Sequence, residues 1–350
     1  MESNGQRTIA KADLAAWLSV LVRRGEVVAP VAVHGGDVAY APVESPEQVV
    51  FEFGNTLQPP KAYVLPQTDP LLRIERDASG YRLESVADRT PRVLFNLRSC
   101  DAVGIAFLKR MHASDLRDGA FLARAESLVL VTLACTTPCE LGFCTCCNAG
   151  PFLADGYDLQ LTDLGDRLLA EPGSEAGAAL LTEAGSLFRP VRPEETRRRL
   201  ELEERAKRSF GEETCHFASA MRRVSTGRVA DELWEEMSDW CLECGGCNFV
   251  CPTCYCFSVK DMKQDGSWLR CRTWDSCQYA AFTLEASGHN PRRRHAERVK
   301  RRFFHKVSAQ YSVRDGTVGC VGCGRCIKVC LGTTDMPAVV EAIREGEWHG

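Results

Sequence analysis

The sequence has 350 residues, which is enough for two domains with a substantial core. Hydrophobic residues make up 45% and charged residues 26%, the ordinary balance of a globular protein in water, and the net charge of −4 excludes a general affinity for nucleic acid. The 19 cysteines are the outlier. They group at the spacing of metal ligands behind a polar N-terminus, which argues against a secreted disulfide scaffold and favours a reducing cytoplasm. Apolar runs are far shorter than the ~20 residues that cross a bilayer, so we expect no membrane insertion.

The N-terminal stretch predicts a mixed α/β or β-rich start. Residues 8–23 predict an amphipathic helix, because apolar residues recur at three- and four-residue spacing at Leu14, Trp17, Leu18 and Leu21. Short strands are expected at 27–33, 49–53 and 62–65, between glycines and prolines.

A βαβ unit follows. Residues 92–97 and 127–134 are apolar runs, separated by a helical pattern, so we expect two neighbouring parallel strands. Cys100 stands just past the first run and Cys135 just past the second. Both cysteines are therefore expected at the carboxyl edge of one sheet, where open α/β sheets build their sites.

The loop after Cys135 is rich in cysteine and predicts a third metal site. The expected ligands of a third 4Fe–4S cluster are Cys100, Cys135, Cys139 and Cys144, with Cys146 and Cys147 as substitutes. The spacing is irregular. A zinc site and unligated buried thiols therefore remain as alternatives.

The next hundred residues carry the predicted domain boundary. We expect a strand at 157–161, a helix starting over 164–169, and a solvated, charged helix at 193–209. The boundary then divides the chain into an α/β domain, 1–210, and a mostly helical ferredoxin-type 4Fe–4S dicluster domain, 211–350. A further helix, 229–240, leads into the first cysteine motif, and its apolar residues, Trp240 among them, are expected to cover a cluster there.

Two cysteine motifs of like spacing are the strongest signal. The first has the form C-x2-C-x2-C-x3-C-P, in which three thiolates surround one cubane cluster and the fourth is sent to a second cluster. The second motif repeats the spacing about 70 residues later, with Leu331 in place of the proline. The crossed arrangement assigns two 4Fe–4S clusters, one to Cys241, Cys244, Cys247 and Cys330, the other to Cys320, Cys323, Cys326 and Cys251.

Zinc sites are the alternative for these motifs, but zinc knuckles usually separate their cysteine pairs by a gap. Glycines within both motifs would let backbone N–H groups approach sulfides closely. Further cysteines between the motifs are expected to pack around the clusters rather than to bind iron, namely Cys254, Cys256, Cys271 and Cys277.

The basic block at 292–302 has two interpretations: a solvated helix face, or a docking face for an acidic redox partner.

Several stretches together resemble a known family. They are the run CxxCGxCxFVCPTCYCF from Cys241, residues 272–277, residues 288–292, residues 301–306 and the run CVGCGRCI from Cys320, with weaker likeness at 98–101, 143–145 and 150–163. They resemble the dicluster iron–sulfur subunits of cytoplasmic complexes: the beta subunit of group 3b NiFe hydrogenases (sulfhydrogenases) and its counterpart in anaerobic sulfite reductases. Two features depart from the family pattern, the missing proline after Cys330 and the extra cysteines of the 139–147 loop.

The resemblance implies an electron-transfer subunit in a hetero-oligomer. Its implied neighbours are an NAD(P)H-oxidising subunit with FAD and a 2Fe–2S cluster, and the catalytic subunit of a hydrogenase or sulfite reductase. The sequence contains no G-x-G-x-x-G after a strand and no G-x4-G-K-[ST], so a relay without a catalytic residue of its own is the main hypothesis.

Two other functions stay open. One is a redox-active subunit whose Cys-rich loop acts directly on a sulfur substrate, suggested by the extra thiols Cys146 and Cys147. The other is nucleic-acid binding through the 292–302 block, which would require steeply salt-dependent DNA binding.

Overall fold

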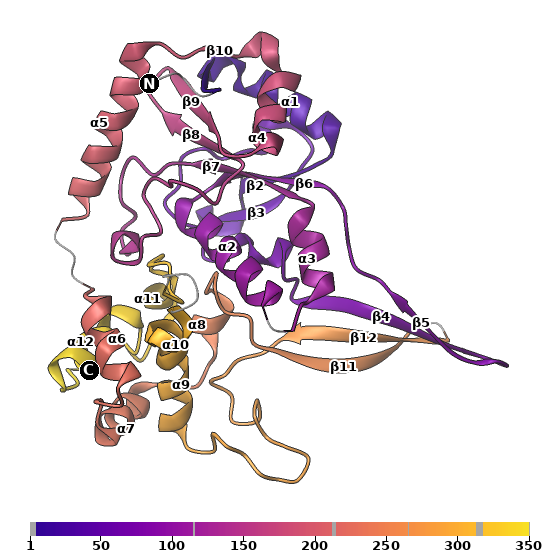
Figure 1. Cartoon of the computed structure of the whole chain (residues 1–350), viewed down its shortest axis with the longest axis vertical. Coiled ribbons are helices and arrows are strands. Elements are labelled where there is room, and N and C mark those ends of the chain that lie inside the picture. Colours follow the sequence, from indigo (N-terminus) through magenta and orange to yellow (C-terminus); the bar gives the residue numbers. More distant parts are fainter. Residues whose placement is uncertain (1–4, 115, 212–214, 265, 313–317, 350) are drawn as a thin grey trace.

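The computed structural model describes residues 5–114, 116–211, 215–264, 266–312 and 318–349. Its N-terminal part is built on an eight-stranded sheet with the strand order β10-β1-β9-β8-β7-β6-β2-β3 (Figure 1). The strands β2, β6, β7 and β8 are parallel, and the flanking strands are antiparallel. The strands are β1 (Arg7–Ala10), β2 (Glu26–Ala32), β3 (Val38–Val43), β6 (Arg92–Leu97), β7 (Leu128–Leu133), β8 (Leu159–Asp163), β9 (Arg167–Pro172) and β10 (Arg189–Pro190).

Helices cover both faces of this sheet, because its central strands carry apolar side chains on each side. On one face α1 (Leu14–Arg24) and α4 (Glu175–Glu183) pack on alternate residues of β2, β6, β7 and β8. On the other face lie α2 (Ser99–Ala113) and α3 (Gly119–Glu126). The four apolar residues predicted to face the core from the first helix, Leu14, Trp17, Leu18 and Leu21, are all buried. The α/β architecture and the parallel β6–β7 pair are thus confirmed.

Several predicted elements differ from the structure. The first helix begins at Leu14, because the preceding residues form β1. The predicted strand at 49–53 is reduced to one bridge from Val49 to Val31, and the predicted strand at 62–65 is replaced by a 3-10 turn, Pro60–Tyr63. The helix expected at 164–169 is wrong: the chain reverses at Gly165, whose φ is 118°, and continues as β9, antiparallel to β8.

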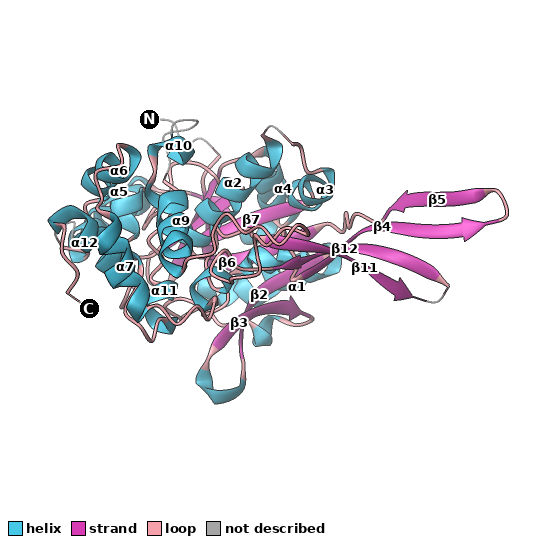
Figure 2. Ribbon diagram, turned by 90° about the horizontal axis from the view of Figure 1, so that it is seen from below, coloured by secondary structure: helices cyan, strands magenta, loops and turns pink. Residues whose placement is uncertain are grey.

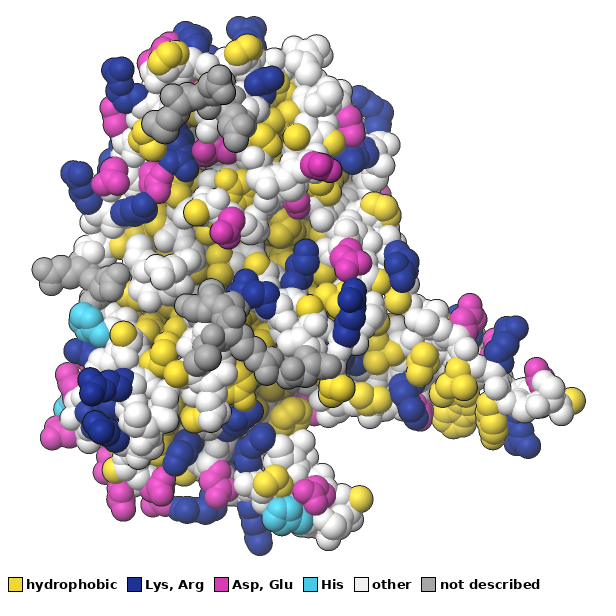
Figure 3. Space-filling model, viewed as in Figure 1, with side chains coloured by type: hydrophobic (Ala, Val, Ile, Leu, Met, Phe, Trp, Pro, Cys, Tyr) yellow, Lys and Arg dark blue, Asp and Glu magenta, His cyan; other side chains and the backbone are white. Residues whose placement is uncertain are grey.

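A second sheet joins the two parts of the chain. It has the order β11-β12-β4-β5, with β4 (Thr68–Asp77), β5 (Gly80–Ser85), β11 (Phe257–Gln264) and β12 (Ser267–Trp274). Figure 2 shows it projecting from the body as an arm, and Figure 3 shows hydrophobic side chains gathered along that arm. At its base, Arg272 and Arg124 both bind the buried carboxylate of Asp69, at 2.6 and 2.8 Å. The pair of Arg272 with Asp69, 203 residues apart in sequence, therefore anchors the base of the arm.

The remaining elements are α5 (Pro193–Ser209), the charged helix that the sequence predicts, and the C-terminal helices. The latter are α6 (Phe217–Ser225), α7 (Asp231–Trp240), α8 (Gly246–Phe249), α9 (His295–Val307), α10 (Ala309–Ser312), α11 (Arg325–Val329) and α12 (Met336–Glu345). Because β11 and β12 also belong to this part, its description as mostly helical is not confirmed. Among the described residues, no helix is long and apolar enough to cross a membrane.

Candidate iron–sulfur site

The two cysteine motifs have the same backbone conformation. In each, the residue before the second cysteine has a positive φ, 53° at Glu243 and 61° at Gly322. The residue after that cysteine is a glycine, again with positive φ, 72° at Gly245 and 74° at Gly324, and it starts a short helix. The third cysteine of each motif lies in that helix, Cys247 in α8 and Cys326 in α11. Such a repeated loop turns successive sulfurs toward one centre, the conformation that a cubane cluster requires of its ligands.

The motifs are also brought together in space, since α8 packs against α11. Burial and then the neighbouring thiolates of Cys241, Cys277 and Cys330 raise the pKa of Cys247 to about 11. Cys330, from the second motif, therefore lies among the cysteines of the first.

The reverse crossing is present as well. The pKa of Cys323 is raised to about 12 by burial, with Cys251 and Cys320 adding to the effect. Cys251, from the first motif, therefore lies among the cysteines of the second. Cys241, Cys247 and Cys330 thus lie near one another, as do Cys251, Cys320 and Cys323, and their identity as ligands stays a prediction.

Two buried cations face these thiols from α9. Arg302 is 6% exposed and Lys306 4%, and they follow Arg298 at four-residue spacing on one side of the helix. Burial lowers the pKa of Lys306, but the electrostatic effect of the nearby sulfurs of Cys251, Cys254 and Cys320 outweighs burial and raises that pKa. Nearby cysteine sulfurs of both motifs likewise raise the pKa of Arg302 against the effect of its burial. Fixed positive charge of this kind compensates the negative charge that sulfur ligands bring into a buried site.

The basic block is only in part the solvated helix face of its sequence interpretation, because Arg293, Arg294 and Lys300 are exposed. Arg298 and Arg302 are buried; Arg298 binds Glu243 and the Gln278 carbonyl. The i, i+4, i+8 spacing of Arg298, Arg302 and Lys306 is the sequence signal that could have identified an inward-facing stripe.

Residues from the N-terminal part complete the surroundings of both motifs. The Lys61 ammonium is buried and donates to the carbonyl oxygens of Asn248, Cys251 and Cys254, at 3.2, 2.8 and 3.1 Å. Arg325 of α11 forms two hydrogen bonds with Asp101 of α2, at 2.6 and 2.9 Å. Sequence reasoning missed Lys61 and Arg325, because no local pattern signals contacts between residues so far apart.

The Cys-rich loop closes over the second motif. The Phe143 N–H donates to the Gly322 carbonyl at 2.7 Å. A Cβ at Gly322 would lie 2.5 Å from the Phe143 carbonyl oxygen, and one at Gly324 would lie 2.2 Å from that of Leu141. Glycine is required at both positions, because the loop backbone occupies the space of a side chain.

The loop's thiols divide into two groups. Burial raises the pKa of Cys144 well above its usual range, and nearby Cys135, Cys139 and Cys323 raise it further. Cys100 has Cys144 and Cys323 among its neighbours. The four cysteines expected at a third site thus lie near one another, and they do so beside the second motif.

Cys146 and Cys147 lie near Cys320 and Cys215 instead. A hydrogen bond with Cys320, and then burial, raises the pKa of Cys147, with Cys215 and Cys146 also close. The structure therefore does not place Cys147 among the thiols of the third site, for which it is a predicted substitute. Sequence reasoning missed Cys215, which lies outside every motif.

The additional cysteines between the motifs also differ among themselves. A hydrogen bond from Cys254 lowers the pKa of Cys251, so Cys254 directly contacts a candidate ligand. Cys256 pairs in the same way with Cys277. Cys271 is buried within β12 and lies in none of these groups.

A single metal ion has no preformed site in the part of the chain that the structure describes, where no three His, Cys, Asp or Glu side chains are close enough to hold one. A cubane cluster spreads its four thiolates over a larger body than one zinc ion does. The residues fit a cluster because the two like loops supply thiols and buried Arg302 and Lys306 supply the compensating positive charge.

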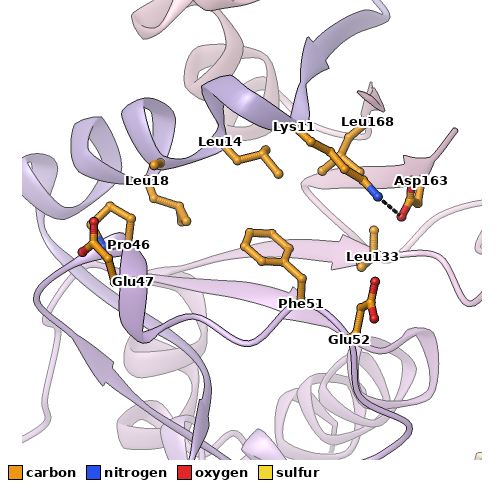
Figure 4. Close-up of a pocket in the computed structure, with 11 residues that line it drawn as sticks. Lys11, Leu14, Leu18, Pro46, Glu47, Phe51, Glu52, Leu133, Asp163 and Leu168 are labelled. Carbon is orange, nitrogen blue, oxygen red and sulfur yellow. Dashed lines mark hydrogen bonds and ion pairs between the residues drawn. The ribbon is translucent and has the colours of Figure 1, made fainter. Parts of the chain in front are cut away.

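A groove lies at the carboxyl edge of the eight-stranded sheet. One cavity, of about 390 Å³, reaches Cys135 and Cys139 and is lined by Arg98. It shares Asp163 and other residues with a second cavity of about 360 Å³, in which Figure 4 shows apolar side chains beside the Lys11–Asp163 ion pair. The βα topology places this groove where α/β sheets bind small molecules.

Comparisons with known proteins agree with this geometry. Residues 240–334 match the model of the 4Fe–4S dicluster domain family. The sulfhydrogenase 2 subunit beta of Pyrococcus furiosus is 30% identical over 331 residues, which covers 92% of this chain and 93% of the relative. No solved structure matches the chain. With near-complete coverage at this identity, the chain belongs to the family of sulfhydrogenase beta subunits.

Proposed function

We propose that this chain is the iron–sulfur electron-transfer subunit of a hetero-oligomeric oxidoreductase complex. The observation that carries the proposal is the pair of cysteine motifs with the same backbone conformation, lodged together and faced by buried Arg302 and Lys306. When bound, 4Fe–4S clusters would accept and release single electrons.

The proposed ligands are those of the crossed arrangement. Cys241, Cys244, Cys247 and Cys330 would hold one cluster, and Cys320, Cys323, Cys326 and Cys251 the other. Lys61, Arg302 and Lys306 would set the local potential, because positive charge near a cluster stabilises its reduced, more negative state. A third cluster is proposed at Cys100, Cys135, Cys139 and Cys144.

The proposed neighbours are an NAD(P)H-oxidising flavoprotein subunit, with FAD and a 2Fe–2S cluster, and the catalytic subunit of a hydrogenase or sulfite reductase. The support is the beta-subunit name of the relative, which marks it as one part of a sulfhydrogenase. A cytoplasmic complex fits the use of free cysteine for metal ligation.

The first test is the iron and acid-labile sulfide content of the anaerobically purified chain. About 8 irons would match two cubanes, and about 12 would add the third. Cys135→Ser distinguishes these outcomes, because it should lower the content from about 12 to about 8 while leaving both dicluster sites loaded. Zinc without sulfide would refute the electron-transfer function.

A second candidate function is direct action of the Cys-rich loop on a sulfur substrate, and the cavity that reaches Cys135 and Cys139 favours it. Alkylation of the anaerobic protein, followed by peptide mass spectrometry, separates the two functions. Direct action requires that Cys139 is labelled, that about 8 irons are retained and that polysulfide turnover is lost. Protection of Cys139 together with about 12 irons would assign it to a cluster and refute the second candidate.

A further inference from the structure

Three exposed apolar side chains surround the first cysteine motif. Trp240 ends α7 with 49% of its surface exposed, Leu242 is 62% exposed, and Leu331 is 87% exposed. Sequence analysis expects Trp240 to cover a cluster, but the structure turns this side chain to solvent while the other apolar residues of α7 are buried. We call Trp240, Leu242 and Leu331 the first-motif patch.

The residues of the patch lie close together although Leu331 is distant from the other two in sequence. Leu242 stands between Cys241 and Cys244, the latter an exposed cysteine. A Cβ on Gly332 would lie 1.7 Å from the Trp240 carbonyl oxygen, so the chain at Leu331 runs directly against the end of α7. Three exposed apolar residues are therefore placed near one another beside candidate cluster ligands.

The second motif provides an internal comparison, because its backbone conformation is the same. Val321 occupies the position that corresponds to Leu242, yet it is 3% exposed. The Cys-rich loop covers the second motif, through the bond from Phe143 to Gly322, whereas Leu242 and Cys244 of the first motif stay exposed. The first motif therefore lacks, on this side, the cover that the loop gives the second.

The rim of the patch is acidic. Glu232 and Glu236 precede Trp240 on α7 at four-residue spacing, so all three share one side of the helix. Asp231 and Glu235 are paired with Lys300 and Arg294 of the basic block. Among the described residues, Glu232, Glu236 and Asp239 form no ion pair, so the α7 side of the rim carries unpaired negative charge.

We propose that the first-motif patch is the docking surface for a redox partner subunit that presents an apolar centre ringed by lysine and arginine. An interface core of large apolar side chains with a polar rim is the usual anatomy of protein association. The acidic rim selects a basic partner and speeds its approach. The inference rests on the proposed electron-transfer function, since docking beside Cys244 brings a partner's cofactor close to the candidate ligands.

The test uses the tagged full-length chain, produced with its native partners and isolated anaerobically. Leu331→Glu places a charge within the patch, and Leu116→Glu is the matched control, because Leu116 is 91% exposed and lies outside the patch. Iron content and reduction by dithionite report the state of the chain itself. Co-isolation of a second flavin- or iron-containing chain, and the rate of NAD(P)H-driven reduction, report docking.

We expect Leu331→Glu to keep its iron and to bind the partner at least about ten-fold more weakly, since burial of one leucine is worth that factor. Leu116→Glu should match the wild type. Glu236→Lys should slow partner-driven reduction at low salt, and the effect should shrink at high salt, as expected for exposed charges. If Leu331→Glu loses iron, the Glu236→Lys variant still tests the docking surface, because Glu236 lies outside both cysteine motifs.

The possible failures are distinguishable. Absence of any flavin- or iron-containing chain from the wild-type isolate would refute the proposed function itself. Equal partner binding by wild type, Leu331→Glu and Glu236→Lys would overturn the docking surface and leave the function standing. Faster reduction of Glu236→Lys would show an acidic partner rim and overturn the proposed charge complementarity.

Discussion

Removal of the Asp101 carboxylate should be one of the most destabilising single changes in this protein. Asp101 is 1% exposed and Arg325 3%, and two hydrogen bonds join them, at 2.6 and 2.9 Å. Asp101→Ala would leave the guanidinium buried without its counter-charge, which typically costs about 3–5 kcal/mol. For a chain of 350 residues the entropy of unfolding is about 0.7 kcal/mol/K, so the melting temperature should fall by about 4–7 °C.

Thermal unfolding followed anaerobically by circular dichroism measures this shift, with iron content determined in parallel to separate it from cluster loss. Asp163→Ala is the control: it breaks the Lys11–Asp163 pair, whose side chains are 40% and 35% exposed, and should cost less than about 1 kcal/mol. The double variant Asp101→Leu/Arg325→Met should recover most of the loss, because it leaves no unpaired charge. A decrease of less than about 1 °C for Asp101→Ala would refute the argument.

Three further outcomes are expected. Gly324→Ala should lower the melting temperature more than Gly36→Ala, because both glycines have positive φ but only the former would meet a carbonyl oxygen, at 2.2 Å; equal shifts would leave strain of the backbone as the sole effect. Arg302→Met should make the cluster potentials more negative in a redox titration monitored by electron paramagnetic resonance, whereas Arg293→Met, at an exposed position, should not. Burial, and to a smaller extent nearby cations, lower the pKa of His305 to about 3. Between that pH and about 6.5, His305 is therefore protonated in the unfolded chain but neutral in the folded protein. The stability contributed by neutral His305 is full above about pH 6.5 and is lost as the pH falls toward 3, by about 1.4 kcal/mol per pH unit. The wild type should therefore lose melting temperature faster than His305→Gln between about pH 7 and about pH 5, and parallel curves would contradict this.

The candidate cluster ligands could be predicted from the sequence because their signal is local. Four cysteines within eleven residues constrain the chain to a tight loop, whatever surrounds it. The tight bend of the backbone at Gly245 and Gly324, which follow the second cysteine of each motif, is predictable for the same reason, because glycine readily takes a positive φ. That Glu243 takes the same positive φ as Gly322 was not, because a non-glycine residue reaches this conformation only with tertiary support, here from Arg298.

The α/β architecture and the parallel β6–β7 pair could also be predicted, from the helical and strand periodicity of apolar residues. These periods failed at 164–169, where Leu164 and Leu168 fit either period and a turn at Gly165 decided for a strand. They also could not show that β12 pairs with β4, because register between strands so far apart depends on the whole fold.

The sequence by itself thus determined the chemistry of the site, since cysteine type and spacing are properties of short segments. Only the tertiary structure decided what surrounds each motif. It brought Lys61 and Arg325 into buried contacts, divided the thiols of the Cys-rich loop between two sides of the second motif, and left Leu242 of the first motif exposed. The physical reason is that burial and charge pairing depend on distances between segments that the chain brings together only on folding.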